Sequence, residues 1–318
     1  MRSQRMAEIS IRRYTPSDAK KWNDFVAKKA RNGNFLFDRN YMDYHADRFP
    51  DCSFLFYRGE EICAVIPGTL DAEGTFSSHA GLTFGGFVVD NSVEAMDVKI
   101  FFDLLDLELR NLGAKKVVYK ALPWIYADRP SQEDLYWLFR KNAKLRARLI
   151  SSTIEPKVSQ PSSKKKYYLN KGNRLGLVFA ESKDFGGFWD LLDRCLQEGH
   201  DAHPVHSKAE LELLASRFPE NIKLYTVTLN GELLSGSVVY ISSQVAHSQY
   251  LASSAKGRSL HAMDFLMMNE TNAFPGQRWF DWGTSNEEQG RVLNEGLVHQ
   301  KETYAARGVA YDIYEYDL

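Results

Sequence analysis

The chain has 318 residues, which is enough for two domains of ordinary size, and 44% of them are hydrophobic and 25% charged. This composition is typical of a globular protein rather than a disordered one. The 40 basic and 41 acidic residues leave a formal charge of −1. Nothing in that balance indicates nucleic acid or an anionic membrane as the main partner.

The cysteines and the first residues bear on the compartment. Cys52, Cys63 and Cys195 are scattered and lack CxxC spacing, which argues against a disulfide framework or a cysteine metal site and favours a reducing compartment. The first eight residues lack the apolar core of a signal peptide. No apolar run approaches the roughly 18 residues that span a bilayer. We therefore expect a cytoplasmic protein with no membrane span and no metal.

Capping and turn residues predict a series of helices and strands in the first half of the chain. A helix begins at Thr15-Pro16, because a Thr cap followed by Pro suits the free N–H groups of a first turn. Gly59 marks a hairpin turn, and Gly113 ends a long amphipathic helix. In chain order the predicted elements are a strand (9–13), a helix from Thr15, a helix (39–48), hairpin strands (53–57 and 62–70), a helix (92–113), a strand (116–121), a helix near Ser131 and a strand (145–154).

The second half repeats this series. Ser207 and Glu210 have the spacing of a capping box at a helix start. Asn230-Gly231 is a strong signal for a two-residue hairpin turn. In chain order the predicted elements are a helix around residues 185–195, a helix from Ser207, hairpin strands (224–229 and 233–241), a strand (245–252), a helix (258–273), a strand (278–282), a helix (290–306) and a strand (309–316).

Both halves thus have two helices, an antiparallel meander, a helix, a strand, a helix and a strand, an order that resembles the GNAT fold. The resemblance implies an α/β protein of the α+β type, with two tandem GNAT-like units. Each unit is expected to have a mixed, largely antiparallel sheet flanked by helices. The stretch between the halves carries Pro156, Pro161 and the run Lys164-Lys165-Lys166, so we predict an exposed linker there. The predicted domains are 1–155 and 174–318, joined by a linker over 156–173.

The C-terminal sequence carries a more specific resemblance. Residues 279–285 read Trp-Phe-Asp-Trp-Gly-Thr-Ser, and residues 294–297 and 300–302 read Asn-Glu-Gly-Leu and Gln-Lys-Glu. This pattern resembles the signature of FemAB-like GNAT acyltransferases, in which an apolar strand ends in Asp-Phe-Gly and a downstream helix carries Gly-Leu, two variable residues, an aromatic residue and a Lys. The chain departs from the family in three ways: Gln300 replaces the aromatic residue, the coiled-coil arm of many Fem enzymes has no counterpart, and the Gly-rich pyrophosphate loop is reduced to residues 255–259.

The resemblance implies an enzyme, an N-acyltransferase. Its expected donor is acyl-CoA, acetyl-CoA or a carrier thioester, and its expected acceptor is an amine on a small molecule, an amino acid or an amino sugar. Two alternatives remain open. One is a Fem-type aminoacyl transferase that uses charged tRNA in cell-wall synthesis. The other is a catalytically inactive GNAT pair that acts as a binding or assembly module.

The second half carries the expected donor site. Gly257, Arg258 and Ser259 follow a strand and open a helix, where backbone N–H groups and a guanidinium can bind a phosphate. Ser253, at the end of that strand, is expected to bind the cofactor with them. The plain alternative is an ordinary strand–helix turn with a solvated Arg.

Three residues are candidates for catalysis. Lys301 matches the family's lysine, and its i, i+4 spacing from Leu297 predicts a place at the margin of a cleft, where its charge could meet a phosphate or an oxyanion. His206, just before the capping box, could take a proton from an ammonium acceptor. Tyr250 could donate one. The alternatives are a surface lysine, a capping histidine and a buried structural tyrosine.

The expected substrate-binding residues come from both halves. Asp281, Thr284 and Ser285 end a strand, where open α/β sheets place their ligands. Trp124 and Tyr126 are expected to line the acceptor cleft. The segment 81–87 contains three glycines but no helix follows it at once, so we do not expect it to bind a nucleotide.

Overall fold

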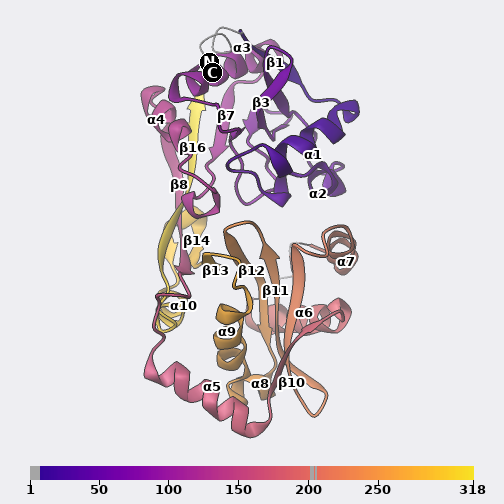
Figure 1. Cartoon of the computed structure of the whole chain (residues 1–318), viewed down its shortest axis with the longest axis vertical. Coiled ribbons are helices and arrows are strands. Elements are labelled where there is room, and N and C mark those ends of the chain that lie inside the picture. Colours follow the sequence, from indigo (N-terminus) through magenta and orange to yellow (C-terminus); the bar gives the residue numbers. More distant parts are fainter. Residues whose placement is uncertain (1–7, 201–203, 205) are drawn as a thin grey trace. The chain divides into compact units, whose positions relative to one another are not determined.

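The computed structural model describes residues 8–200, 204 and 206–318 (Figure 1). The chain divides into two compact units. Unit 1 comprises the residues up to Leu149 together with Gln289–Arg291 and Ala310–Leu318. Unit 2 comprises Ile150–Glu288 and Val292–Val309. Both units combine sheets and helices, as expected for an α+β protein.

Unit 1 contains two sheets with helices packed against them (Figure 1). One sheet is antiparallel, in the order β1-β2-β3-β6. The other has the order β4-β5-β7 followed by the end of β16, with β5 and β7 parallel. The elements are β1 (Ile9–Arg13), α1 (Ala19–Lys28), α2 (Arg39–Met42), β2 (Phe54–Arg58), β3 (Glu61–Ile66), β4 (Thr69–Leu70), β5 (Thr75–Ser77), β6 (Val88–Val89), α3 (Ala95–Asn111), β7 (Lys116–Lys120), α4 (Glu133–Arg140), the 3-10 helices η4 (Asp43–His45) and η5 (Trp124–Tyr126), and the start of β8 (Lys144–Ile154).

The core of unit 1 forms against α3. This helix repeats apolar residues at helical spacing, so Phe101, Leu105 and Leu109 are all fully buried on one face. Phe56 and Phe87 pack on Phe101, with ring centroids 4.8 and 5.6 Å away. Aromatic burial on this scale is a major source of packing energy in a small unit.

Unit 2 contains one larger sheet in the order β8-β13-β12-β11-β10-β9 (Figure 1). Its strand pairs are antiparallel except for the parallel pair β12–β13. The elements are the end of β8, α5 (Ser163–Leu175), β9 (Val178–Ser182), α6 (Phe185–His200), α7 (Lys208–Arg217), β10 (Ile222–Leu229), β11 (Glu232–Ile241), β12 (Val245–Ser253), α8 (Ala255–Leu260), α9 (Ala262–Ala273), β13 (Trp279–Thr284), β14 (Asn286–Glu287), β15 (Val292–Leu293), α10 (Glu295–Glu302) and the start of β16 (Arg307–Asp317).

Helices α6 and α9 cover opposite faces of this sheet. Phe188 of α6 lies against Gly236 of β11, where a Cβ would come within 2.6 Å of its ring. Val239 lies three residues after Gly236 in β11, and it belongs to the core cluster that contains Met267 of α9. Since side chains alternate along a strand, positions 236 and 239 face opposite sides of the sheet, with α6 on one side and α9 on the other. Figure 1 shows α9 in front of the strands of unit 2.

The last strand of each sequence repeat joins the other unit. Residues 313–317 of β16 pair with β7 in unit 1, and residues 151–154 of β8 pair with β13 in unit 2. Tyr314 and Tyr316 belong to the apolar cluster of unit 1, which explains where the C-terminal strand lies. The predicted boundaries, 1–155 and 174–318, therefore differ from the compact units at these two strands.

The stretch predicted as an exposed linker, 156–173, contains most of α5. Lys165 in this helix is buried and forms an ion pair with Asp264 of α9. Gly172 is packed so closely on α9 that a Cβ would come within 2.3 Å of the Phe265 ring. A proline-flanked, lysine-rich segment is helical here because α9 supplies both a counter-charge and an apolar surface.

The sequence correctly predicted the helix cap at Ser207 and the hairpin turn at Asn230-Gly231, but two predicted helices have other bounds in the structure. The capping box of Ser207 and Glu210 is present, and Asn230 and Gly231 have the positive φ values of the predicted hairpin turn. The helix predicted over 258–273 is instead α8 and α9, separated at His261, whose φ is 61°. The helix predicted over 290–306 is shortened to α10, because Asn294 caps it through the N–H of Leu297.

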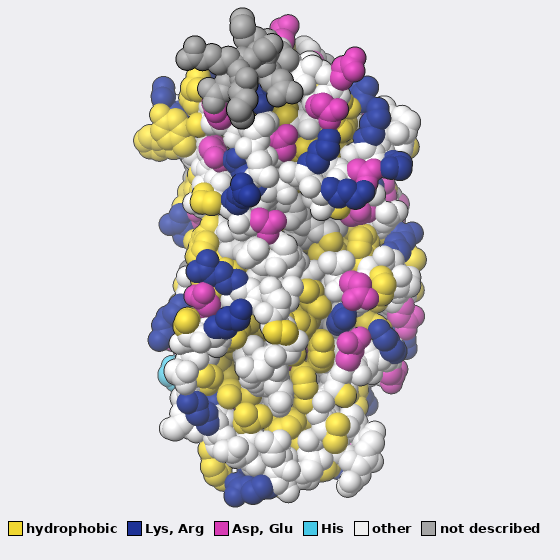
Figure 2. Space-filling model, in the orientation of Figure 1, with side chains coloured by type: hydrophobic (Ala, Val, Ile, Leu, Met, Phe, Trp, Pro, Cys, Tyr) yellow, Lys and Arg dark blue, Asp and Glu magenta, His cyan; other side chains and the backbone are white. Residues whose placement is uncertain are grey.

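Charged side chains of both signs are interspersed over the face shown in Figure 2, as the nearly balanced composition predicts. In the described part of the chain, no helix combines the length and the hydropathy needed to cross a membrane.

Candidate active site in the second unit

The parallel strands β12 and β13 pair only at their beginnings. The last pair is His247 with Asp281, and beyond it β12 continues to Ser253 without pairing to β13. A bulge in β12 follows at once, since Val238 pairs with Tyr250 and Val239 with Ser248. Bulges of this kind redirect side chains and are frequent beside functional sites.

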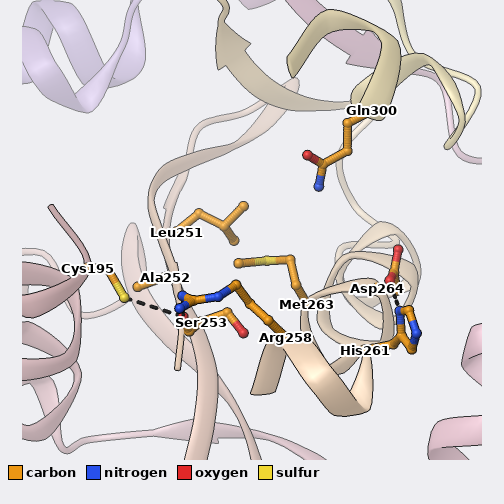
Figure 3. Close-up of a pocket in the computed structure, with 9 residues that line it drawn as sticks. All are labelled: Cys195, Leu251, Ala252, Ser253, Arg258, His261, Met263, Asp264 and Gln300. Atoms are coloured by element: carbon orange, nitrogen blue, oxygen red, sulfur yellow. Dashed lines mark hydrogen bonds and ion pairs between the residues drawn. The ribbon is translucent and has the colours of Figure 1, made fainter. Parts of the chain in front are cut away.

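The end of β12 lines a pocket of about 370 Å³ (Figure 3). Its size falls in the range of sites for small molecules or parts of larger ones. Figure 3 shows Met263 and Arg258 extending into the space between Cys195 on one side and Gln300 on the other. All the lining residues belong to unit 2: Cys195, Leu251, Ala252, Ser253, Arg258, His261, Met263, Asp264 and Gln300.

Two of the four predicted donor-site residues line this pocket. The guanidinium of Arg258 donates to the carbonyl of Ser253 at 2.7 Å, so one edge is fixed and the rest of the group faces the pocket. The Ser253 hydroxyl is buried and bonded to Ser235 at 2.7 Å. Gly257 lies on the carbonyl of Leu234, where a Cβ would come within 2.3 Å. Its N–H is capped by Ser254 at 3.0 Å and so is not directed at a ligand.

Ser259, the last predicted donor-site residue, is exposed on α8 and turned back on its own helix. Its hydroxyl donates to the carbonyl of Lys256 at 2.8 Å. Ser259 is not among the residues that line the pocket.

Lys301 is buried in α10 rather than placed at the margin of a cleft. Its ammonium donates to the carbonyls of Gly283 and Thr284 at 2.9 and 3.1 Å and to the hydroxyl of Ser285 at 2.9 Å. Burial lowers the pKa of Lys301 to about 8, although the nearby Asp281 carboxylate opposes that shift. With three donors directed at the end of β13, the side chain holds α10 against that strand. The predicted substrate residues Thr284 and Ser285 are its partners.

Asp281 is fully buried and serves as a hydrogen-bond acceptor for its neighbours. It accepts from Ser151 and Thr153 of β8 at 2.5 and 3.0 Å and from the N–H of Gly283 at 3.1 Å. His247 Nδ1 lies 3.1 Å from its other oxygen. These contacts orient the end of β13 and leave no exposed surface of Asp281 for direct contact with a substrate.

The predicted catalytic residues His206 and Tyr250 lie together. The Tyr250 hydroxyl and His206 Nδ1 are 2.5 Å apart, and the Tyr250 ring packs edge-on against Trp189 of α6. Neither residue lines the pocket, but Tyr250 lies on the same face of β12 as the pocket residue Ala252, because side chains alternate along a strand. A histidine and a tyrosine in hydrogen-bond contact can pass a proton between them.

We did not predict from the sequence the polar cluster that lies at the other side of the pocket. His261 Nδ1 lies 3.1 Å from Asp264, and the His261 ring stacks on Tyr168 of α5 with centroids 3.8 Å apart. Asp264 also accepts from Lys165 and, at 2.6 Å, from the hydroxyl of Tyr304. The i, i+3 spacing of His261 and Asp264 was visible in the sequence, whereas Lys165 comes from the segment predicted as a linker.

The predicted acceptor residues of the first half lie in unit 1. Trp124 is 49% exposed on η5, but Tyr126 is buried in the core. Its ring packs on Phe84 with centroids 4.6 Å apart, and its hydroxyl meets that of Tyr311 at 3.0 Å. Tyr126 therefore supports η5 from beneath rather than lining a surface.

Within residues 8–200, 204 and 206–318, no three His, Cys, Asp or Glu side chains lie close enough together to hold a metal ion. His203, which belongs to a histidine-rich stretch before the capping box, lies outside the described residues.

Comparisons with known proteins agree with this architecture. Residues 162–289 match the family described as an acetyltransferase (GNAT) domain. No curated protein matches the sequence. Among solved structures, FemX is similar with a TM-score of 0.71 at 12% identity, over 97% of this chain and 97% of that one.

Two other solved structures are similar over the same extent. The C-terminal domain of a putative lysylphosphatidylglycerol synthetase from Agrobacterium fabrum has a TM-score of 0.61 at 12% identity, over 94% of this chain and 92% of that one. A tandem GNAT protein from the clavulanic acid biosynthesis pathway has a TM-score of 0.52 at 11% identity, over 98% of each chain. At these identities the likeness concerns the fold, and it confirms the predicted α+β class with two tandem GNAT-like units.

Proposed function

Since the chain has the FemAB-like tandem GNAT fold, with a GNAT domain over residues 162–289, we propose that it is an N-acyltransferase. The pocket at the end of β12 carries this proposal. All its lining residues except Gln300 belong to the GNAT domain, it lies beside the point where β12 and β13 cease to pair, and it presents a guanidinium. We place the activated acyl donor there, with acyl-CoA or another thioester as the first candidate.

The chemistry required is simple. A neutral amine attacks the donor carbonyl, the C–N bond forms, the carbonyl's bond to the leaving group breaks, and the proton released by the amine is delivered to the leaving group. In this proposal His206 and Tyr250 carry that proton, because they share a hydrogen bond and Tyr250 lies on the same face of β12 as the pocket residue Ala252. Lys301 acts indirectly, by holding the end of β13 in place.

The donor assignment predicts a defined role for Arg258. Arg258→Ala should raise KM for the thioester about 10-fold or more, because a charge-assisted hydrogen bond to a phosphate is worth about 1.5–3 kcal/mol. The turnover number should change little, since the phosphate is bound equally in the ground and transition states. Steady-state kinetics and titration calorimetry with a panel of acyl-CoAs measure both quantities.

The control for Arg258 is Arg217→Ala, which removes an exposed arginine of α7 away from the pocket. Equal KM values for Arg258→Ala and Arg217→Ala would show that the donor does not bind in this pocket. If no acyl-CoA binds the wild-type protein at all, the thioester assignment fails.

One feature favours a second candidate donor, aminoacyl-tRNA. Helix α5 contains no acidic residue and exposes Lys164, Lys166 and Arg174, and its Tyr168 stacks on the pocket residue His261. Exposed cations with nearby aromatic rings are typical of surfaces that bind nucleic acid. This donor predicts RNA that co-purifies with the protein and is lost after nuclease treatment, as seen in the ratio of absorbance at ~260 and ~280 nm. A protein that uses neither donor but retains a protein partner would instead be an inactive binding module.

A further inference from the structure

The junction of α8 and α9 places a histidine and a carboxylate, His261 and Asp264, together at the pocket (Figure 3). We call these two residues the dyad. His261 separates the two helices and has a φ of 61°, in the left-handed region that residues other than glycine adopt at a cost. A side chain at this position ordinarily caps the helix that follows, but the His261 ring makes no such bond. Its Nδ1 instead lies 3.1 Å from Asp264, three residues further along the chain.

The Asp264 carboxylate is itself held in place. It accepts from the ammonium of Lys165, and the hydroxyl of Tyr304 donates to it at 2.6 Å. Burial alone would raise the pKa of Asp264, but the hydrogen bonds to Lys165, Tyr304 and His261 lower it below its ordinary value. An ionised carboxylate accepts and does not donate, so Nδ1 of His261 carries the proton of their hydrogen bond. The neutral ring is thereby held in the tautomer whose Nε2 is a proton acceptor.

Nε2 of His261 remains accessible. It has no hydrogen-bond partner among the described residues and is not one of their buried unpaired atoms, and the side chain is 33% exposed. One face of the ring is covered by Tyr168 of α5, with ring centroids 3.8 Å apart. Figure 3 shows the ring and the Asp264 carboxylate turned toward each other beside the pocket that both residues line. A histidine that is fixed at Nδ1 and accessible at Nε2 has the arrangement of a general base.

The charges around the dyad leave Nε2 as the place where an ammonium ion can bind. The titratable and charged groups that surround it are Lys164, Lys165 and Tyr168 of α5, Arg258 of α8, Asp264 of α9, and Tyr304. Asp264 is the one carboxylate among the described residues that line the pocket. Because three donors already share this carboxylate, an ammonium ion that enters the pocket finds its unengaged acceptor at Nε2 of His261.

We propose that His261 is the general base that takes the first proton from the ammonium of the acyl acceptor, with Asp264 as the positioning residue that holds its ring. The assignment rests on the proposed acyltransferase function. The ammonium donates to Nε2, its N–H bond breaks, and the electron pair stays on the amine nitrogen, which becomes the nucleophile. The proton forms a bond to Nε2, and Asp264 stabilises the imidazolium until water removes that proton.

The second proton follows the other route. After the amine has attacked, its remaining proton is carried by Tyr250 and His206 to the leaving group, as proposed above. Each proton thus has its own histidine. The first step matters only for acceptors that are ammonium ions at neutral pH, so the dyad assigns alkylamines and amino acids as the substrate class.

Initial rates of acetyl transfer from acetyl-CoA to glucosamine, lysine and putrescine, between pH 7 and 9.5, test this role. His261→Ala should lower kcat/KM for the amine by about 10²-fold at pH 7. The loss should shrink as pH rises, because the variant depends on amine that is already neutral in solution, which increases about tenfold per pH unit below the amine's pKa. Wild type accepts the ammonium form and should change little over this range. The loss should be smaller for glucosamine than for putrescine, because glucosamine is the weaker base.

Two further variants separate a base from a structural residue. His261→Asn tolerates the left-handed backbone but supplies no base, so its pH profile should match that of His261→Ala. Added imidazole should restore part of the activity of His261→Ala, because a small ring can supply the missing base. His299→Ala, which removes an exposed histidine of α10, should behave as wild type. A folded His261→Asn with the rate and pH profile of wild type would overturn the proposal.

A measurement without any donor distinguishes this inference from the proposed function. In the full chain with isotope-labelled histidine, the Nε2 resonance that is missing from His261→Asn should shift when each of the three amines is added. If it shifts but no acetyl-CoA is consumed, the dyad binds amines and the thioester-dependent function fails. If acetyl-CoA is consumed at a rate that does not depend on His261, the function stands and the dyad is not its base. No shift with any of the three amines would also overturn the proposal.

Discussion

Glu270 is a buried ionisable residue that the candidate active site does not use. It lies on α9, is fully buried, and neither of its carboxyl oxygens has a hydrogen-bond partner in the described part of the chain. Ser237, its polar neighbour on β11, is bonded to Ser248 at 3.0 Å. Burial raises the pKa of Glu270 to about 8, so the carboxyl group is neutral in the folded protein at pH 7.

Glu270 should make stability fall as pH rises. The unfolded chain loses this proton near its ordinary pKa of about 4.3, whereas the folded protein keeps it until about 8. Between these values the folded state binds one proton more, so unfolding becomes easier by up to ~1.4 kcal/mol per pH unit. Glu270→Gln removes this pH-dependent contribution to the free energy of unfolding, because Gln does not ionise. Urea denaturation at pH 5 and 8 should show a smaller difference for Glu270→Gln than for wild type.

The control for Glu270 is Glu212→Gln, an exposed position on α7. It should leave the pH dependence unchanged. If Glu270→Gln also leaves it unchanged, the carboxyl group is ionised in the folded protein.

At the scale of elements, short contacts from one side chain hold α10 on the end of β13. Lys301 spans from the helix to Gly283, Thr284 and Ser285, and Asp281 fixes the same strand from the other side through β8. From the sequence we had expected Lys301 near a cleft, where its loss would affect catalysis more than folding. Its burial reverses that expectation.

Lys301→Met should destabilise the protein by about 2 kcal/mol or more, because it leaves buried carbonyl groups and a hydroxyl without a donor. Activity is expected to fall along with it, since the end of β13 is no longer held. Glu302→Met, at the exposed neighbouring position of α10, should change the free energy of unfolding by about 0.5 kcal/mol or less. Equal unfolding midpoints for the two variants in urea would mean that Lys301 does not join these elements.

At the scale of the molecule, exchanged last strands tie the C-terminus to unit 1. Tyr316 of β16 is buried in the core of unit 1, and its hydroxyl donates to Asp106 of α3 at 2.8 Å. Arg148 binds Asp312 through two hydrogen bonds of 2.6 and 2.8 Å in the same unit. A substitution at the end of the chain should therefore lower the stability of unit 1.

Tyr316→Ala should destabilise unit 1 by about 3 kcal/mol, as expected for the loss of a large buried aromatic side chain. Limited proteolysis followed by mass spectrometry should show faster cleavage within residues 8–149 and an unchanged rate within the GNAT domain. Asp317→Ala, which alters the exposed neighbour, is the matched control. Faster cleavage confined to residues 162–289 would contradict the assignment of this strand to unit 1.

Much of the fold could be predicted from the sequence because its signals are local. The Ser207 cap, the Asn230-Gly231 turn and the apolar face of α3 depend on residues within a few positions of one another, and the repeated order of elements indicated two GNAT-like units. The tertiary structure alone decided which sheet each last strand joins, that α5 is helical, and that Lys301 is buried. These depend on partners far away in the chain: β7 for β16, Asp264 for Lys165, and the end of β13 for Lys301. Residues 78–86 follow the same rule, since Lys120 of β7 contacts the His79 carbonyl, and the His79 ring contacts His45 of η4, only when these elements have packed.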